Sequence, residues 1–275
     1  MQVSEIYLKD LFDESHFEQV SSEIPRLDFV SRNAINTKSS EKSVLAYSGG
    51  IDSAICARLL SGASGVSLLS LGLSGSRDVL DLRHNLDSTL LVELDRERIE
   101  HAALKVAPLA KYGSISHFED CVAFYLIGEE ARKLGAGKVI SANGPDEVYC
   151  GYDRFRRLID DQGEEAVGRE IRRALVIAED LSKKVKSILS TLGMGCEEPF
   201  LKKEFTSFAL GLPAALKLRT GNDRLRKRIW RAYGRSLGLP DRTVLKEKKA
   251  MQYSMGIHKI VGAMVKRGTI ALERS

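Results

Sequence analysis

The sequence has no apolar run approaching the ~20 residues that a membrane-spanning helix requires. Its first residues, MQVSEIYLKD, lack the basic-then-apolar pattern of a signal peptide. The 275 residues include four cysteines, which are widely separated, form no CxxC pair and have no histidine at metal-ligand spacing. These absences argue against a membrane protein and against a zinc site, and they predict a cytoplasmic protein with reduced thiols.

The sequence also has little excess of either charge, because 42 basic residues balance 37 acidic ones and leave a formal net charge of +5. This balance permits an anionic ligand but does not require nucleic acid as a partner. The hydrophobic content of 43% is ordinary for a globular protein. The chain is long enough for one large domain or for one domain with a substantial appendage.

Short apolar runs alternate with helical patterns in the first half of the chain. Strands are predicted at 43–47, 64–73, 88–94 and 137–143. Apolar residues recur at helical spacing in 52–60, 77–86 and 117–135, which predicts helices there. This alternation predicts an α/β fold with a parallel sheet of about five strands and helices on both faces. We divide the chain into a partly helical lead-in (1–42), an α/β core (43–155) and a mostly helical C-terminal part without a convincing strand (156–275).

The stretch 44-VLAYSGGIDSAICARLL-60 joins a predicted strand to a predicted helix through two glycines. Such a turn presents backbone N–H groups and a helix dipole to a phosphate, and glycines allow the anion to approach. A carboxylate would repel a phosphate unless a divalent cation lies between them, so we predict that Asp52 is a ligand of Mg²⁺. The loop has neither the GxxxxGK[ST] nor the GxGxxG spacing. The candidate nucleotide-binding residues here are Tyr47, Ser48, Gly49, Gly50, Asp52 and Ser53.

A second stretch, 139-VISANGPDEVYCGYDRF-155, carries an acid just after another predicted strand. The carboxyl ends of parallel strands meet at one edge of a sheet, where α/β proteins bind ligands. We therefore expect Asp146 to share a Mg²⁺ ion with Asp52. Ser141, Ala142 and Gly144 are the candidate nucleotide contacts of this stretch.

SGGIDS resembles the SGGxDS pyrophosphate loop of the N-type ATP pyrophosphatases, whose fold is the adenine nucleotide alpha hydrolase-like (HUP) sheet. These enzymes cleave ATP between the α and β phosphates, form an adenylate and release pyrophosphate. ANGPDEVYCGY is similar to the SGEGxDExFxGY motif of the asparagine synthetase branch. The resemblance implies ATP and Mg²⁺ as cofactors.

Three further segments resemble that branch in the same order along the chain. LGLSGSRD (71–78) is similar to GLxGSxD, which implies an adenine contact at Leu71. GCEEPFLKKEF (195–205) resembles ExRxPFLD, and KEKKAMQYSMGI (246–257) resembles RPKKAxQYxSG. The last resemblance implies that Lys248 neutralises the leaving pyrophosphate, a role that a positioned ammonium group can fill.

The chain departs from the family pattern at several acceptor-side positions. Asn143, a candidate catalytic position, replaces the acid of GEG and cannot act as a general base. Gly195, Glu197 and Lys202 stand where the Glu, Arg and Asp of ExRxPFLD would be. Gln2 follows Met1 where the family's glutaminase domain begins with a catalytic Cys, so we expect a stand-alone synthetase domain that receives ammonia or another amine.

The resemblance implies an AMP-forming carbon–nitrogen ligase that adenylates a carboxylate and then forms an amide. Aspartate is the default acceptor and ammonia the default nitrogen donor, with a separate amidotransferase subunit as a possible partner. A homo-oligomer is expected, and a membrane is not.

Two other functions remain open at this stage. A tRNA- or nucleoside-modifying ATP pyrophosphatase is suggested by 216-LKLRTGNDRLRKRIWRAYGR-235, where eight basic residues interleave with Trp230 and Tyr233. We favour packing of this segment as an amphipathic helix over RNA binding. A non-catalytic nucleotide-binding subunit is suggested by Asn143.

Overall fold

The computed structural model describes residues 11–35, 41–75, 89–221, 223–247 and 255–271. Its centre is a parallel sheet of five strands in the order β3-β2-β1-β4-β5. The strands are β1 (Ser43–Ala46), β2 (Val66–Leu73), β3 (Thr89–Leu94), β4 (Lys138–Ile140) and β5 (Gly195–Glu197). The predicted α/β class is confirmed, as are the four strands predicted in the first half of the chain.

The expectation of no strand in 156–275 was wrong, because β5 pairs with β4 in the register Val139↔Cys196. Only three residues form this edge strand, and the run GCE contains a single apolar side chain. So short a strand has no alternating pattern by which the sequence could reveal it.

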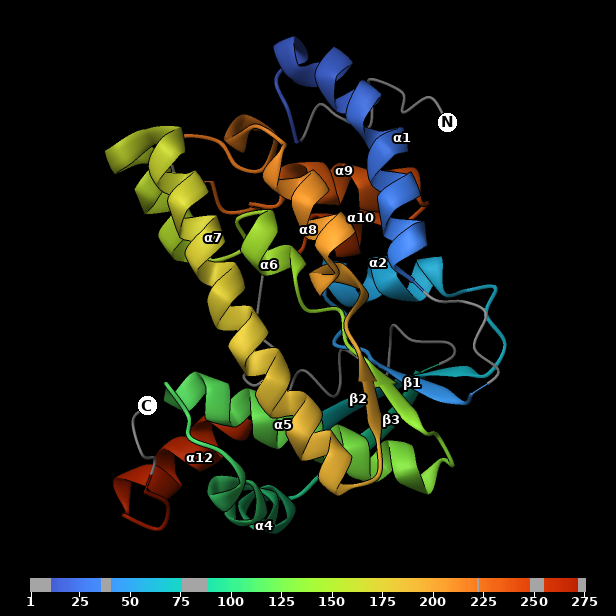
Figure 1. The fold of residues 1–275 in the computed structure, drawn as a ribbon, viewed down its shortest axis with the longest axis vertical. Coiled ribbons are helices and arrows are strands. Elements are labelled where there is room, and N and C mark those ends of the chain that lie inside the picture. Colours follow the sequence, from blue (N-terminus) through green and yellow to red (C-terminus); the bar gives the residue numbers. More distant parts are fainter. Residues whose placement is uncertain (1–10, 36–40, 76–88, 222, 248–254, 272–275) are drawn as a thin grey trace.

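Helices cover both faces of the sheet (Figure 1). One core, which includes Leu45 and Ile140, packs the sheet against α1 (Phe17–Ala34), α2 (Ile51–Leu59), α8 (Lys203–Leu210) and α9 (Arg228–Ser236). The other, which includes Val44 and Leu69, packs it against α4 (Arg96–Val106), α5 (Ile115–Lys133) and α12 (Ile257–Lys266). Because Val44 and Leu45 are adjacent in β1, their side chains point to opposite faces of the sheet, and both faces are buried.

The long helix α7 (Asp153–Thr191) contributes to both cores. Its first half buries Val167 and Ile171 in the core on the α9 side, and its second half buries Val185 and Leu189 in the core on the α5 side. Figure 1 shows it running along the molecule past α6 (Pro145–Val148) and α5. Gly163 interrupts the helix with φ 74° and ψ −173°, a conformation that glycine adopts without steric cost.

The remaining described elements are short: the helix α10 (Asp241–Val244) and the 3₁₀ turns η2 (Glu14–His16), η3 (Ala107–Leu109), η4 (Pro199–Leu201) and η5 (Ala214–Leu216). Among the residues that the structure describes, no helix has the length and apolarity to cross a bilayer. The predicted helix at 77–86 lies outside the described residues.

The direction of the sheet order reverses between β1 and β4, since β2 and β3 follow on one side of β1 and β4 lies on the other. Such a switch point opens a crevice at the carboxyl ends of the two strands. The SGGIDS loop follows β1, and the ANGPD turn follows β4. The fold therefore brings the two predicted nucleotide-binding stretches to one place.

Candidate functional site

The SGGIDS loop is a tight turn held by its own two hydroxyl groups. The backbone N–H of Ser48 donates to the Ser53 Oγ at 3.2 Å, and the N–H of Gly50 donates to the Ser48 Oγ at 3.3 Å. The Ser53 hydroxyl also donates to the Gly50 carbonyl at 3.1 Å. Gly49 has φ 70°, a left-handed conformation that favours glycine. These bonds give the loop one defined shape at the start of α2.

The turn after β4 depends on a glycine that no other residue could replace without a shift of the backbone. Gly144 has φ 120°, and a Cβ at this position would lie 2.3 Å from the Phe200 carbonyl oxygen. The N–H of Ser141 donates to the Glu197 carbonyl of β5 at 2.8 Å, and the Ser141 Oγ accepts the Asn143 N–H at 3.2 Å. The turn after β4 is thereby bonded to β5, and its glycine packs closely against Phe200, in the segment after β5.

The carboxylates of the two loops converge on one side chain, the ammonium group of Lys227. Its Nζ lies 2.5 Å from the Asp52 Oδ2 and 2.6 Å from the Asp146 Oδ1. Lys227 is 1% exposed, so this cation is held inside the protein. Burial acts to lower the pKa of Lys227, but Asp146 and Asp52 outweigh it and raise that pKa above its usual value. Lys227 is therefore a buried cation at neutral pH that holds two acids together.

Two neighbours confine this group of three charges. The indole N–H of Trp230 donates to the Asp52 Oδ1 at 2.9 Å, so both carboxylate oxygens of Asp52 have a donor. Gly151 lets the chain pass close by, because a Cβ there would lie 1.9 Å from the Asp146 Oδ1 and 2.4 Å from the Lys227 Cε. The glycine of the ANGPDEVYCGY motif is therefore required for steric reasons, since any side chain at Gly151 would collide with Asp146 and Lys227.

The backbone that presents Lys227 is in an unusual conformation. Arg226 and Lys227 have φ 47° and 50°, a left-handed conformation that costs a non-glycine residue roughly 1–2 kcal/mol. The buried carboxylate of Asp223 stabilises this turn by accepting the N–H groups of Arg219 and Arg226 and by pairing with the Arg228 guanidinium at 2.7 Å. Strain of this kind concentrates at functional sites, where surrounding contacts enforce it.

The acceptor-side departures form contacts with one another. Lys202 and Glu197, which replace an acid and a base of the family motif, form an ion pair with a Nζ–Oε1 distance of 3.3 Å. Burial acts to raise the pKa of Glu197, but Lys138 and Lys202 outweigh it and lower that pKa. The Asn143 amide donates to the buried Glu198 carboxylate at 3.5 Å. The charges at 197 and 202 are thus exchanged rather than lost.

Two of the predicted nucleotide contacts, Tyr47 and Leu71, lie near the carboxyl end of β1. The Tyr47 N–H donates to the Leu69 carbonyl at 2.8 Å, and the Ser70 hydroxyl donates to the Tyr47 carbonyl at 2.6 Å. Leu71 is buried two residues beyond Leu69, the last β2 residue in register with β1. Its backbone therefore lies past the carboxyl end of β1, beside the SGGIDS loop.

Lys248 lies outside the described residues, so its predicted contact with pyrophosphate stays a prediction. The chain just before it is held by α9. The Arg231 guanidinium donates to the Lys246 carbonyl at 3.0 Å and to the Val244 carbonyl. Since Trp230 of the same helix contacts Asp52, the segment that leads to Lys248 starts beside the candidate site.

The donor set at Asp52 and Asp146 fits a divalent cation shared with phosphates. Their carboxylates already meet at one cation, the Lys227 ammonium. Within the described ranges no three His, Cys, Asp or Glu side chains form a cluster that could hold a metal by themselves. Two carboxylates completed by substrate phosphates and water match the preference of Mg²⁺, so these residues would hold the ion only together with a nucleotide.

In the basic segment 216–235 the helix α9 begins only at Arg228, and the aromatic rings of this helix do not face solvent. Trp230 and Tyr233 are fully buried, and Trp230 stacks on Tyr149 with ring centroids 5.2 Å apart. Arg228 and Arg231 are buried as well. The predicted packing of these rings is confirmed, so they are not available for stacking on bases, but the expected helix is confirmed only from Arg228 onward.

Sequence reasoning missed Lys227, Trp230 and Asp223 as parts of the site. Lys227 belongs to a run of basic residues, a pattern that is typical of a solvated surface. A signal was present in Trp230, the single tryptophan of the chain, which lies three residues after that lysine.

Comparison with known proteins adds sequence relatives to this geometry. Residues 174–269 match the asparagine synthase family model. The chain is 25% identical to a putative glutamine-hydrolysing asparagine synthetase of Methanocaldococcus jannaschii, with 88% of this chain and 51% of the relative aligned. The chain therefore spans about half the length of the curated relative that it matches. The resemblance predicted from the motifs is confirmed by these two matches.

Two solved structures are similar at low TM-score. A U34-tRNA thiolase of Methanococcus maripaludis has a TM-score of 0.37 and 12% identity, and the match covers 87% of this chain and 78% of that one. An NMN synthetase of Francisella tularensis has a TM-score of 0.31 and 14% identity, with coverages of 93% and 97%.

Proposed function

We propose that this protein, whose chain is similar to asparagine synthases, is an ATP-dependent, AMP-forming ligase that joins a carboxylate to ammonia or another amine. The observation that carries the proposal is the convergence of Asp52 and Asp146 at one cation position, each from a loop at the switch point of the sheet. An SGGxDS turn beside paired carboxylates suits the binding of a triphosphate through a divalent ion.

In the first step, an oxygen of the substrate carboxylate attacks the α-phosphorus of ATP. The bond from that phosphorus to the oxygen bridging the α and β phosphates breaks, and pyrophosphate leaves with the electron pair. The loop residues Ser48, Gly49, Gly50 and Ser53 bind the pyrophosphate through backbone N–H and hydroxyl groups. Asp52 and Asp146 would hold Mg²⁺, which offsets the charge on the leaving group. Lys248 adds a positive charge at the same group.

Other residues of the site orient the nucleotide. Tyr47, Leu71, Ser141, Ala142 and Gly144 surround the adenosine part at the carboxyl ends of β1, β2 and β4. Lys227 keeps the two metal-binding carboxylates side by side before the nucleotide arrives, because its charge offsets their mutual repulsion. The crevice is therefore organised for the transition state in advance.

In the second step, the amine nitrogen attacks the acyl carbon of the adenylate. The bond from that carbon to the AMP oxygen breaks, and the nitrogen releases a proton to water. The neutral Asn143 amide cannot take up this proton, so we assign it the orientation of the acceptor. Aspartate and ammonia are the first acceptor and donor to test, and a separate amidotransferase subunit is a possible source of ammonia.

The test is product analysis with a panel of carboxylic acids and ammonium at saturating Mg-ATP. We expect AMP and pyrophosphate in equal amounts, dependent on one class of acid, and no ADP. Asp146→Asn should abolish turnover, whereas Glu165→Gln, which changes an exposed acid of α7, should leave it unchanged. AMP formation that requires tRNA instead of an acid, or ATP binding without turnover for every acid, would contradict the proposal.

A further inference from the structure

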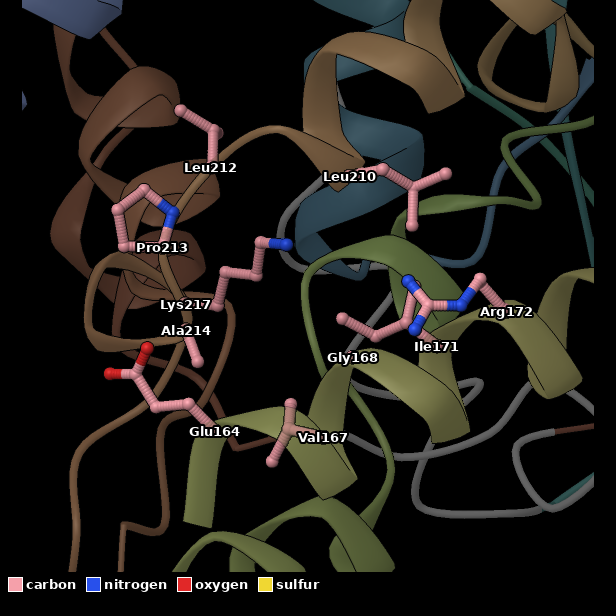
Figure 2. Close-up of a pocket in the computed structure, with 10 residues that line it drawn as sticks. All are labelled: Glu164, Val167, Gly168, Ile171, Arg172, Leu210, Leu212, Pro213, Ala214 and Lys217. Atoms are coloured by element: carbon pink, nitrogen blue, oxygen red, sulfur yellow. The ribbon is translucent and has the colours of Figure 1, made fainter.

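A second lysine, Lys217, is buried outside both nucleotide loops. It is 2% exposed and lines a pocket of about 180 Å³ between α7 and the segment 210–217. Figure 2 shows its side chain reaching from that segment into the space beside Val167, Gly168 and Ile171 of α7. None of the pocket's lining residues belongs to the SGGIDS loop or to the turn after β4.

The ammonium group of Lys217 makes no hydrogen bond or ion pair with the residues that the structure describes, and its Nζ reaches the accessible surface of the pocket. Burial lowers its pKa from 10.5 to about 8, and Cys150 and Glu164 act weakly in the opposite direction. At neutral pH it is therefore still mostly a cation. A buried cation without a counter-ion is costly, and an anion placed against it would remove that cost.

The rest of the pocket limits what such an anion can be. Part of its wall is apolar, formed by residues that include Val167, Ile171, Leu212 and Ala214, and polar groups supply the rest. A cavity of roughly 150 Å³ suffices for a benzene ring. A highly hydrated inorganic anion would gain nothing from the apolar wall, whereas a small acid with an apolar body would bury its body there.

The titratable groups around Lys217 lie in α7 and in the turn before it. Cys150 lies just before α7, and burial raises the pKa of its thiol to about 12, so it is neutral at physiological pH. Glu164 and Arg172 are exposed residues of α7 at the rim, on opposite sides of Lys217 in Figure 2. Because Glu164 and Arg172 carry opposite charges, their effects on a ligand's charge largely cancel. The buried Lys217 ammonium therefore decides that the ligand is an anion.

We propose that this pocket is a binding site for a small monocarboxylate with an apolar body, whose carboxylate pairs with the Lys217 ammonium. The site is a neighbour of the candidate ATP site, because the Lys217 carbonyl accepts the N–H of Arg228 at 2.9 Å, next to Lys227. Binding requires neither ATP nor turnover, so the proposal stands apart from the proposed function.

The probe is benzoate, with benzamide as a neutral molecule of the same shape, titrated calorimetrically into the full chain without nucleotide. We expect benzoate to bind at neutral pH at least tenfold more tightly than benzamide, because only benzoate pairs with the ammonium. Benzoate binding should weaken by roughly tenfold or more at pH 9.5, where a lysine with this pKa is mostly neutral.

Two variants separate the pocket from other sites. Lys217→Met keeps the volume and should bind benzoate no better than benzamide. Gly168→Leu should block both molecules and remain folded, since a Cβ at Gly168 would meet no atom closer than the Arg172 guanidinium at 4.0 Å. Thermal unfolding of each variant checks the fold. Equal affinity for benzoate and benzamide, unchanged benzoate binding in Lys217→Met, or no saturable binding at millimolar benzoate would overturn the proposal.

Discussion

Replacement of Lys227 by methionine tests whether this ammonium holds the two acids together. The side chain keeps its length but loses the charge that lies 2.5 Å from Asp52 and 2.6 Å from Asp146. Removing one partner of a buried ion pair costs about 3–5 kcal/mol. Because the two aspartate side chains are 22% and 23% exposed, solvent reduces this, and we expect a loss of about 3 kcal/mol in the free energy of unfolding at pH 7.

The pH dependence of this loss has a defined sign. At pH 7 two carboxylates face each other in Lys227→Met without a cation between them, and their repulsion destabilises the fold. As the pH falls through the range near 4 where aspartates take up protons, this repulsion disappears and the difference from the wild type should shrink. Mg²⁺ should stabilise Lys227→Met more than the wild type, because the two carboxylates then lack the ammonium charge and attract a divalent ion more strongly.

The assay is urea unfolding of both proteins at pH 7 and at about pH 4, with and without Mg²⁺. Lys217→Met is the matched control, since Lys217 is equally buried but has no acidic partner within hydrogen-bond distance in the described part of the chain. Its pKa of about 8, against 10.5 in a free lysine, corresponds to a cost of about 3 kcal/mol for the charged form. Lys217→Met should therefore be as stable as the wild type or more stable.

The same control makes a second prediction about pH. Since the folded-state pKa of Lys217 lies below the unfolded value, the unfolded chain binds more protons between pH 8 and 10.5, and wild-type stability should rise across that window. Lys217→Met should lack this rise. Equal stability changes in the Lys227 and Lys217 variants, or a Lys227→Met protein within about 0.5 kcal/mol of the wild type, would refute the reasoning.

Two other substitutions test single contacts of the site. Gly151→Ala should abolish turnover and lower the unfolding temperature, because its Cβ would lie 1.9 Å from the Asp146 Oδ1 and force the acid away from Lys227; wild-type activity would contradict this. Trp230→Phe should cost about 2–4 kcal/mol of stability, since it leaves a cavity and removes the N–H bond to Asp52, and circular dichroism during urea unfolding measures it. A cost below 1 kcal/mol would mean that this indole bond and its packing contribute little.

Much of the sheet was predictable because its strands are short apolar runs between helical patterns. SVLA and VSLLSLGL are both such runs, and each ends at a glycine-containing turn. The position of Asp52 and Asp146 at neighbouring strand ends followed from the same reasoning, since parallel strands share one carboxyl edge. The strand GCE was not predictable because its pairing with β4 depends on contacts distant in sequence.

The lysine between the two acids could not be predicted from local sequence patterns. Lys227 lies 175 residues after Asp52, and its burial depends on left-handed backbone at 226 and 227 and on the Asp223–Arg228 pair. Hydrophobic periodicity ranks lysine and arginine as surface residues, yet α9 buries Arg228, Arg231 and Arg235 against carbonyl and carboxylate groups. Buried charges of this kind become visible only once their partners are placed.

The central claim is that the convergent acids support adenylation of a carboxylate. Exchange of radiolabelled pyrophosphate into ATP, measured with the acid that supports turnover and without any amine, isolates that step from amide formation. We predict acid-dependent exchange in the wild type and in Glu165→Gln, and none in Asp146→Asn. Exchange that persists in Asp146→Asn, or AMP formation without any acid-dependent exchange, would contradict the account.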